Sequence, residues 1–489
     1  MSASRKAGPT GDLFVNANFV RAVRESGYTS LATALAELVD NSLQADATAV
    51  DILIARDAPE SGPDITVIDN GLGMGRAELE ACLQFGGTTR FNDRGSFGRF
   101  GMGLPAASLS QSRHIEVVSW QGNNYGLKVV LDVDAVVAGR TASIKAERSD
   151  HPAETPSGCA VTLMDCDRIE YQRLAWLHRA LHRDLGRIYR RFIQNGLVLR
   201  VNGTQVKARD PLLLNHVIEG HTASLAFEPM RYELATAAAG TSFVEVRFSI
   251  LPVHEWHHLD NLAKRRAGIV GAGGVSILRA GREIAFGWHF MGTKRKENYD
   301  DWWRCEIEFQ PELDEAFGIT INKQGIRPSA QLRDALDPEL EAVARLLNSR
   351  VRQAFEETKF REASEKSCRI AEAADPKLPI LRTRGRRSGP AGSLNYRLRS
   401  AALQSGVMIA THLQGGTIEV TLNTDHPSFD ALYRPLQSLS NSSGESALRT
   451  AIELLILSFA RTSLMEQACA TDDILEIWSD VYAKMLQST

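Results

Sequence analysis

The feature that most constrains this chain is a set of three short motifs that follow one another between residues 37 and 103. The first is E-x-x-D-N, formed by Glu37, Asp40 and Asn41. Apolar residues around it recur with a period of about 3.6, which predicts an amphipathic helix with Thr29 or Ser30 as its N-cap. Glu37 and Asn41 share one helical face, where a carboxylate and an amide can position a water molecule and a Mg²⁺ ion. Taken alone, the pattern is more typical of a solvated helix face.

The second motif, D-x-G-x-G, extends from Asp69 to Gly73 and follows the strand-like segment DITVID. An aspartate at a strand end can accept a hydrogen bond from an exocyclic amine, and glycines let the backbone approach a planar ring. The third motif extends from Gly98 to Gly103, where a glycine-rich loop precedes a helix-like segment. Such glycines form an anion cradle from backbone N–H groups. Each motif is weak evidence alone, but this order is rare.

Periodicity and composition divide the rest of the chain into segments. We expect the fold class to be α+β, with helices on one face of a mixed sheet in the first domain. The predicted segments are a helix-and-sheet domain at 1–165, a second α+β domain at 166–357, a polar, arginine-rich linker at 358–400 and a small α/β domain at 401–489.

Composition and charge exclude several classes of protein. Hydrophobic residues make up 43% and charged residues 24% of the chain, which excludes a disordered or fibrous protein. A net charge of -3 argues against a uniformly basic nucleic-acid binder. Two basic stretches, 173–191 and 379–400, hold six arginines each. Singly, each fits a solvated helix or a linker, but together they make DNA a candidate partner.

Cysteine spacing and hydropathy restrict the compartment. The six cysteines are scattered and include no C-x-x-C pair, so neither a disulfide framework nor a cysteine-rich zinc finger fits. The N-terminal stretch lacks the apolar core of a signal peptide, and no long apolar run follows it. We therefore expect a cytoplasmic protein that does not contact a membrane.

Two histidine patterns are candidate metal sites of low specificity. Residues 254–258 match H-E-x-x-H, but Pro252 precedes them and no amphipathic pattern surrounds them, which favours a loop or short turn over a zinc site. His178 and His182 are also four residues apart. They lie in an arginine-rich helix that would repel a cation.

The three motifs together resemble the GHKL ATPase superfamily of gyrase, ninety-kilodalton heat-shock chaperones, histidine kinases and MutL. The segments ALAELVDNSLQA, VIDNGLGMG and GRFGMGLPAAS are most similar to the Microrchidia (MORC) branch and its prokaryotic relatives. The resemblance implies a Bergerat-type α/β sandwich that binds ATP with Mg²⁺. It also implies a βαβ transducer-like second domain.

The resemblance assigns roles to individual residues of the three motifs. It implies that Glu37 is the general base that activates water, that Asn41 ligates Mg²⁺, and that Asp40 and Asn41 both belong to the nucleotide-binding residues. It implies that Asp69 binds the adenine amine. The residues that it places around the ring and the phosphates are Gly71, Gly73, Met74, Gly98, Arg99, Phe100, Gly101, Met102 and Gly103.

Two further residues follow from the same resemblance. The family usually has a threonine after a glycine in the strand that closes the adenine pocket. Here Cys159 stands in that place, and because a thiol is a poorer hydrogen-bond partner than a hydroxyl, Thr162 is a candidate substitute. In the transducer-like domain, a lysine reaches the γ-phosphate in the family, and the segment GITINKQGIRP offers Lys323. The alternative for Lys323 is a surface lysine in a turn.

These features leave three functions open. The first is an ATPase switch, in which ATP orders a lid, two N-terminal domains dimerise transiently, and slow hydrolysis resets them. Its output would be clamping of DNA or regulation of an effector protein, and the prokaryotic relatives imply an antiviral defence or DNA-maintenance setting. The second is a chaperone-like ATPase that acts on protein clients. The third is a GHKL-type protein kinase, which the lysine segment and the lack of an upstream hairpin with an acceptor histidine weaken.

Overall fold

The computed structural model divides the chain into two compact units, one at residues 1–252 and 259–347 and the other at 253–258 and 348–489. Each unit is described by itself. The residues that the structure describes are Ala22, Arg24, Tyr28, 30–56, 61–85, 102–122, 125–138, 144–150, 155–170, 173–236, 240–319, 325–379, Leu381, 394–404, 406–438, 443–464 and Val481.

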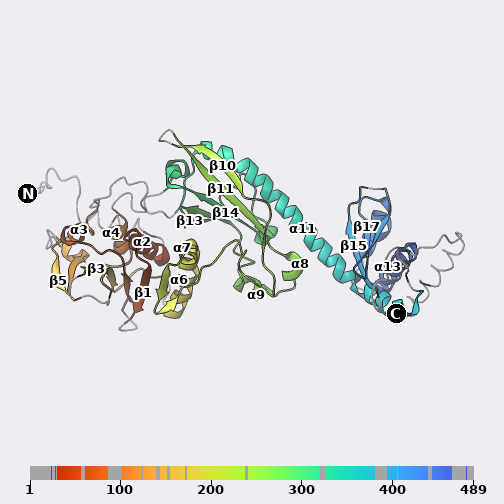
Figure 1. Cartoon of the computed structure of the whole chain (residues 1–489), viewed down its shortest axis with the longest axis horizontal. Helices are drawn as coiled ribbons and strands as arrows, with labels where there is room; N and C mark the ends of the chain where they lie inside the picture. The colour runs from red at the N-terminus through yellow and green to blue at the C-terminus, as the bar shows by residue number, and fades with distance from the viewer. Residues whose placement is uncertain are drawn as a thin grey trace, which may run out of the picture. The chain divides into compact units, whose positions relative to one another are not determined.

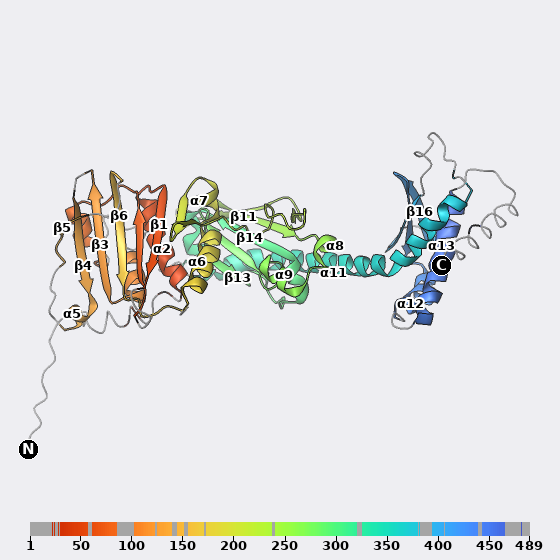
Figure 2. The same cartoon turned by 90° about the horizontal axis from the view of Figure 1, so that it is seen from below.

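The first unit contains an eight-stranded sheet in the order β5-β4-β3-β6-β2-β1-β7-β8 (Figure 2). Its neighbouring strands are antiparallel, except that β1 and β7 are parallel. The strands are β1 (Ala49–Ala55), β2 (Asp64–Asp69), β3 (His114–Gln121), β4 (Gly126–Asp132), β5 (Glu147–Ser149), β6 (Ser157–Met164), β7 (Val198–Val201) and β8 (Thr204–Gln205).

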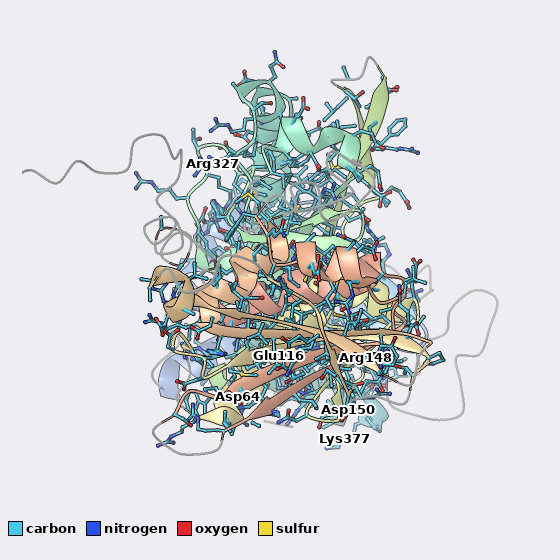
Figure 3. All side chains as sticks on the ribbon, turned by 90° about the vertical axis from the view of Figure 1, so that its left-hand side faces the viewer. Asp64, Glu116, Arg148, Asp150, Arg327 and Lys377 are labelled. Atoms are coloured by element: carbon cyan, nitrogen blue, oxygen red, sulfur yellow. The ribbon has the colours of Figure 1, made fainter. Side chains whose placement is uncertain are left out.

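Helices cover one face of this sheet, as Figure 3 shows, with the labelled Glu116 on the other side. The helices of this region are α2 (Leu31–Gln44), α3 (Arg76–Ala81), α4 (Gly103–Gln111), α5 (Val133–Val137), α6 (Leu174–Ile188) and α7 (Arg190–Gln194). The helix predicted around the first motif is confirmed as α2, and the Ser30 side chain accepts a hydrogen bond from the Thr33 N–H as its N-cap. The core between helices and sheet includes Leu35 and Ile65, both with 0% exposure.

The first sheet also takes in residues beyond 165, where the sequence placed the end of the first domain. Strand β7 pairs in parallel with β1, and the same core continues to Val206. The pairing is between segments far apart in the chain, so local periodicity carries no signal of it.

A second sheet in the first unit has the order β10-β11-β14-β12-β13, with β9 paired to β11 (Figure 1). Strands β12 and β14 are parallel. They are connected through β13 and η1, where the expected βαβ unit would have a crossover helix. The elements are β9 (Ser224–Leu225), β10 (Met230–Ala235), β11 (Thr241–Ile250), α9 (Asn261–Arg266), β12 (Val275–Arg279), β13 (Arg282–Gly287), η1 (Asn298–Trp302), β14 (Trp303–Phe309), η2 (Pro311–Leu313) and α10 (Asp314–Phe317).

Helix α11 (Ala330–Ala374) contributes to both units. Leu336 and Leu340 pack in the core of the second sheet, whereas Phe360 and Ala371 belong to the core of the second unit. Residues 358–374, which composition assigned to a linker, are therefore helical and partly buried. Composition hid this because charged residues are frequent in the segment, whereas the buried positions, among them Phe360, Ser364 and Ala371, recur at helical spacing.

The second unit contains a three-stranded sheet in the order β15-β17-β16. Strand β15 lies inside the segment predicted as a linker, and its Arg399 forms an ion pair with Glu419 of β17 at 2.9 Å. The elements are α8 (Val253–Trp256), η3 (Asp375–Lys377), β15 (Asn395–Ala401), β16 (Ile409–Gln414), β17 (Thr417–Asn423), the π-helix η4 (Phe429–Tyr433), α12 (Arg434–Ser438) and α13 (Ser443–Ser463). Across the described ranges, no helix has both the length and the apolar character needed to cross a membrane.

Candidate functional site

Helix α2 places two carboxylates in the interior of the first unit. Glu37 is 2% exposed and Asp40 is 0% exposed, whereas Asn41 is half-buried. An ionised carboxylate is costly to bury unless donors or cations are close to it. The surroundings of each carboxylate therefore indicate what it does.

Glu37 lies between Tyr28 and the first residue of α4. The Tyr28 hydroxyl forms a hydrogen bond with Glu37, and burial together with the negative charges of Glu37 and Asp40 raises the pKa of Tyr28. A Cβ atom on residue 103 would overlap with Glu37 Oε1, so Gly103 lets the carboxylate reach the N-terminus of α4. A helix N-terminus presents backbone N–H groups and the positive end of the helix dipole. A buried carboxylate and a helix N-terminus of the kind that binds anions thus lie side by side.

Asp69, the last residue of β2, is held as a hydrogen-bond acceptor. Its carboxylate accepts from the Ser42 hydroxyl at 2.8 Å and from the Gly71 N–H at 2.9 Å. Burial raises the pKa of Asp69, and hydrogen bonds from Gly71, Ser42 and the backbone of Cys159 oppose that rise. Because two donors fix its orientation, Asp69 is prepared to accept a further hydrogen bond from a ring amine.

The loop after Asp69 is pinned by neighbouring elements. The Leu72 N–H donates to the Ala45 carbonyl at the end of α2, and the Met74 N–H donates to the Ser119 hydroxyl of β3 at 2.6 Å. Gly73 has φ +68°, and a Cβ atom there would overlap with the Trp120 carbonyl oxygen. Gly73 thus permits a close approach of this loop to the backbone of β3.

Of the two residues considered for the adenine pocket, the structure brings only Cys159 to Asp69. Cys159 pairs directly with Asp69 across β6 and β2, so their side chains point to the same face of the sheet. Thr162 lies three positions further along β6 and so faces the opposite side. Its hydroxyl is 3.1 Å from that of Thr66. Thr162 therefore does not lie beside Asp69, where a substitute for the missing threonine would have to be.

Asp40 faces away from this site toward the second sheet. Its Oδ1 accepts a hydrogen bond from the Tyr189 hydroxyl at 2.7 Å and one from Arg282 Nε at 3.1 Å. Sequence reasoning grouped Asp40 with the nucleotide-binding residues, but its carboxylate is engaged by these two partners. Neither partner was identified from the sequence, because Arg282 is 242 positions away along the chain and no local pattern marks it.

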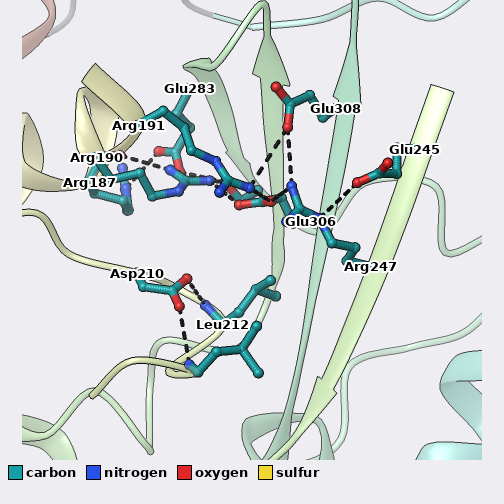
Figure 4. Close-up of polar contacts among 12 residues, drawn as sticks. Arg187, Arg190, Arg191, Asp210, Leu212, Glu245, Arg247, Glu283, Glu306 and Glu308 are labelled. Carbon is teal, nitrogen blue, oxygen red and sulfur yellow. Dashed lines mark hydrogen bonds and ion pairs between the residues drawn. The ribbon is translucent and has the colours of Figure 1, made fainter. Parts of the chain in front are cut away.

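The arginines of the stretch 173–191 are partly interior (Figure 4). Arg190, whose side chain is 2% exposed, bridges Glu283 at 3.0 Å and Glu306 at 2.6 Å. Arg187 pairs with Glu283 at 2.6 Å, and Arg191 with Glu306 at 2.9 Å. These three arginines join α6 and α7 to the second sheet through ion pairs, a role that the sequence did not indicate.

The histidine patterns have other partners. Helix α8 ends at Trp256, so H-E-x-x-H forms a short turn, as expected; His257 Nε2 lies 2.7 Å from Glu362 Oε1. His178 Nε2 lies 3.0 Å from Asn202 Nδ2, and the His178 and His182 rings are 6.5 Å apart. Among the residues described, no group of three or more His, Cys, Asp or Glu side chains could hold a metal ion.

ATP and Mg²⁺ fit the residues that are present. The acceptor at Asp69, the close backbone approach at Gly73 and the helix N-terminus at Gly103 are features that would suit the adenine ring and phosphates of a nucleotide. Mg²⁺ usually keeps several waters and binds through one or two protein oxygens plus phosphates, so Asn41 is sufficient as a protein ligand. The segment from Gly98 to Gly101 and Lys323 lie outside the described residues.

Comparison with known proteins agrees with this geometry. Residues 28–157 match the model of the family described as histidine kinase-, DNA gyrase B- and HSP90-like ATPases. A stretch of 78 residues is 38% identical to ATPase MORC2B of Mus musculus. The first domain is a GHKL ATPase domain related to MORC. The match covers 16% of this chain and 8% of that relative, so it concerns the ATPase domain alone.

Replacement of Asp69 by Asn tests the nucleotide pocket of this GHKL domain. An amide offers one acceptor oxygen fewer and no charge, and loss of a charge-assisted hydrogen bond costs about 1.5–3 kcal/mol. We expect Asp69→Asn to weaken binding of a non-hydrolysable ATP analogue roughly 10–100-fold in calorimetry. Asp51→Asn, which changes an ion pair with Arg200 on β1 and β7, is the control and should bind normally. Equal affinity of the wild type for ATP and GTP would contradict the assignment.

Proposed function

We propose that this chain is an ATP-binding conformational switch that hydrolyses ATP slowly to ADP and phosphate. The observation that supports it best is the placement of the Glu37 carboxylate against Gly103 at the N-terminus of α4. A general base must lie within one water molecule of the phosphate that it serves, and a phosphate bound at this helix N-terminus would meet that requirement. Membership of the domain in the GHKL family supports the same activity.

In the proposed mechanism, the protein residues bind ATP, orient the attacking water molecule and move one proton. Asp69 accepts from the adenine amine, and the N-terminus of α4 with Met102 and Gly103 binds phosphate. Glu37 takes a proton from water as the water oxygen bonds to the γ-phosphorus, and the bond from that phosphorus to the ADP oxygen breaks. When bound, Mg²⁺ neutralises phosphate charge, and Asn41 is its proposed protein ligand.

The output of the switch is a separate part of the proposal. Lys323, together with residues 98–101, would respond to the γ-phosphate and close the site, with transient homodimerisation of the first domains. Closure would clamp DNA or regulate an effector protein, in a setting of DNA maintenance or antiviral defence. The relation to MORC supports this output over a chaperone acting on protein clients or a protein kinase.

Nucleic acid remains the best-supported class of partner, although fewer arginines are available to contact its phosphates than the sequence indicated. Arg187, Arg190 and Arg191 are held by glutamates, and Arg397 and Arg399 face Glu419. The arginines that keep the proposal are the exposed Arg173 and Arg179 and those between residues 382 and 387, a segment without an acidic residue. A local cluster of this kind is sufficient for phosphate contacts even in a chain of net charge -3.

Glu37→Gln tests the proposed chemistry. The amide keeps the shape of the side chain but cannot accept the proton, so we expect kcat to fall about 10²–10⁴-fold while binding of an ATP analogue is retained. Glu116→Gln is the matched control, since Glu116 lies on the opposite face of the sheet and pairs with Lys128 at 3.2 Å. It should keep wild-type turnover. Near-normal turnover of Glu37→Gln would remove Glu37 from the mechanism.

The partner class is tested by ATP turnover with and without duplex DNA over a series of salt concentrations. If the chain clamps DNA through arginine–phosphate contacts, DNA should stimulate turnover, and the effect should decline steeply as salt rises. Indifference to DNA combined with stimulation by an unfolded protein would favour the chaperone function. Transfer of the γ-phosphate to protein would favour the kinase.

A further inference from the structure

Two buried carboxylates of α2 interact with one cation that comes from the second sheet. Glu37 and Asp40 are one helical turn apart on α2, and both are buried. Arg282, the first residue of β13, is 5% exposed, and its Nε donates to Asp40. Tyr189, between α6 and α7, donates to the same oxygen of Asp40 or to the Ala36 carbonyl. Two segments that are distant in the sequence, one at Tyr189 and one at β13, thus meet at one turn of α2.

The charge of Arg282 acts on both carboxylates. Burial alone would lower the pKa of Arg282, but Asp40, Tyr189 and Glu37 together raise it, so the guanidinium stays ionised. Removal of this cation would leave the buried charge of Asp40 without its guanidinium one helical turn from Glu37, which favours displacement of that turn of α2. A general base must remain ionised and in place to work.

We propose that Arg282 is a positioning residue for ATP hydrolysis, which through Asp40 and Tyr189 holds the turn of α2 that carries Glu37 and Asn41. The inference rests on the proposed function of Glu37 as general base. In this proposal the second sheet supplies Arg282, and without Arg282 the carboxylate of Glu37 is misplaced. The neighbouring Glu283 reinforces the connection, since it joins β13 to Arg187 and Arg190. Hydrolysis therefore depends on contact between α2 and β13.

The alternative is an ion pair that only stabilises the fold, and the chain offers a matched control for it. Arg279, which pairs with Arg282 across the β12–β13 hairpin, is equally buried and contacts Asp314 at 2.7 and 2.9 Å. Arg279→Gln breaks a buried ion pair next to the same β12–β13 turn, but the partner in that pair is Asp314 and not a residue of α2. A structural role predicts similar behaviour of Arg279→Gln and Arg282→Gln.

The experiment measures kcat, KM and affinity for a non-hydrolysable ATP analogue in the full chain. We expect Arg282→Gln to lower kcat roughly 10–100-fold, as a misplaced catalytic group does, with analogue affinity within about threefold of wild type. Arg282→Lys, which keeps the charge, should recover part of kcat. Arg279→Gln should keep the wild-type kcat. Equal effects of Arg282→Gln and Arg279→Gln, or wild-type kcat in Arg282→Gln, would overturn the proposal.

A second pair of variants covers a failure of Arg282→Gln to fold. Tyr189→Phe removes only the hydroxyl that reaches Asp40 and should lower kcat several-fold with unchanged analogue affinity. Tyr396→Phe is its control, because Tyr396 donates to Asp375, which also contacts Arg461, in the second unit. Wild-type kcat in Tyr189→Phe would overturn the proposal. If the wild type and Glu37→Gln turn over ATP equally, the proposed function itself fails, whatever Arg282 does.

Discussion

The pairing of buried charge between α2 and β13 is the interaction on which the rest of the first unit depends. Asp40 has no exposed surface, and Arg282 is almost as deeply buried. Removing either partner leaves an uncompensated charge in the interior, which typically costs about 3–5 kcal/mol. Helix α2 and the second sheet are therefore held in one arrangement, and Glu37, one helical turn from Asp40, is held with them.

The same principle extends across the contact between α6, α7 and the second sheet. Arg190 lies between Glu283 and Glu306. Burial alone would raise the pKa of Glu306, but the nearby arginines, Arg190 first, lower it below its usual value. Buried ion pairs contribute little net stability compared with apolar packing, but their geometry is demanding. A set of such pairs favours one register between helices and strands. In the proposed switch, these ion pairs would transmit a movement of α2 to β13 and β14.

The sequence was sufficient for local features and insufficient for contacts between distant segments. The helix that carries Glu37, the strand that ends at Asp69 and the turn at Gly73 follow from periodicity and glycine chemistry, which act over a few residues. Arg282 and Tyr189 were missed because nothing near them in the chain marks a partner on α2. Composition taken as an average over the segment likewise did not predict the helix at residues 358–374, whose buried positions recur at helical spacing among charged residues.

The central claim is that Asp40 and Arg282 act on ATP turnover as one unit. A double-mutant cycle measures this directly, with kcat at saturating ATP for the wild type, Asp40→Asn, Arg282→Gln and the double variant. If the pair acts together, the double variant should be no slower than the slower single variant, within about twofold. If the two reductions multiply in the double variant, the residues act independently and the proposed connection between α2 and the second sheet is wrong.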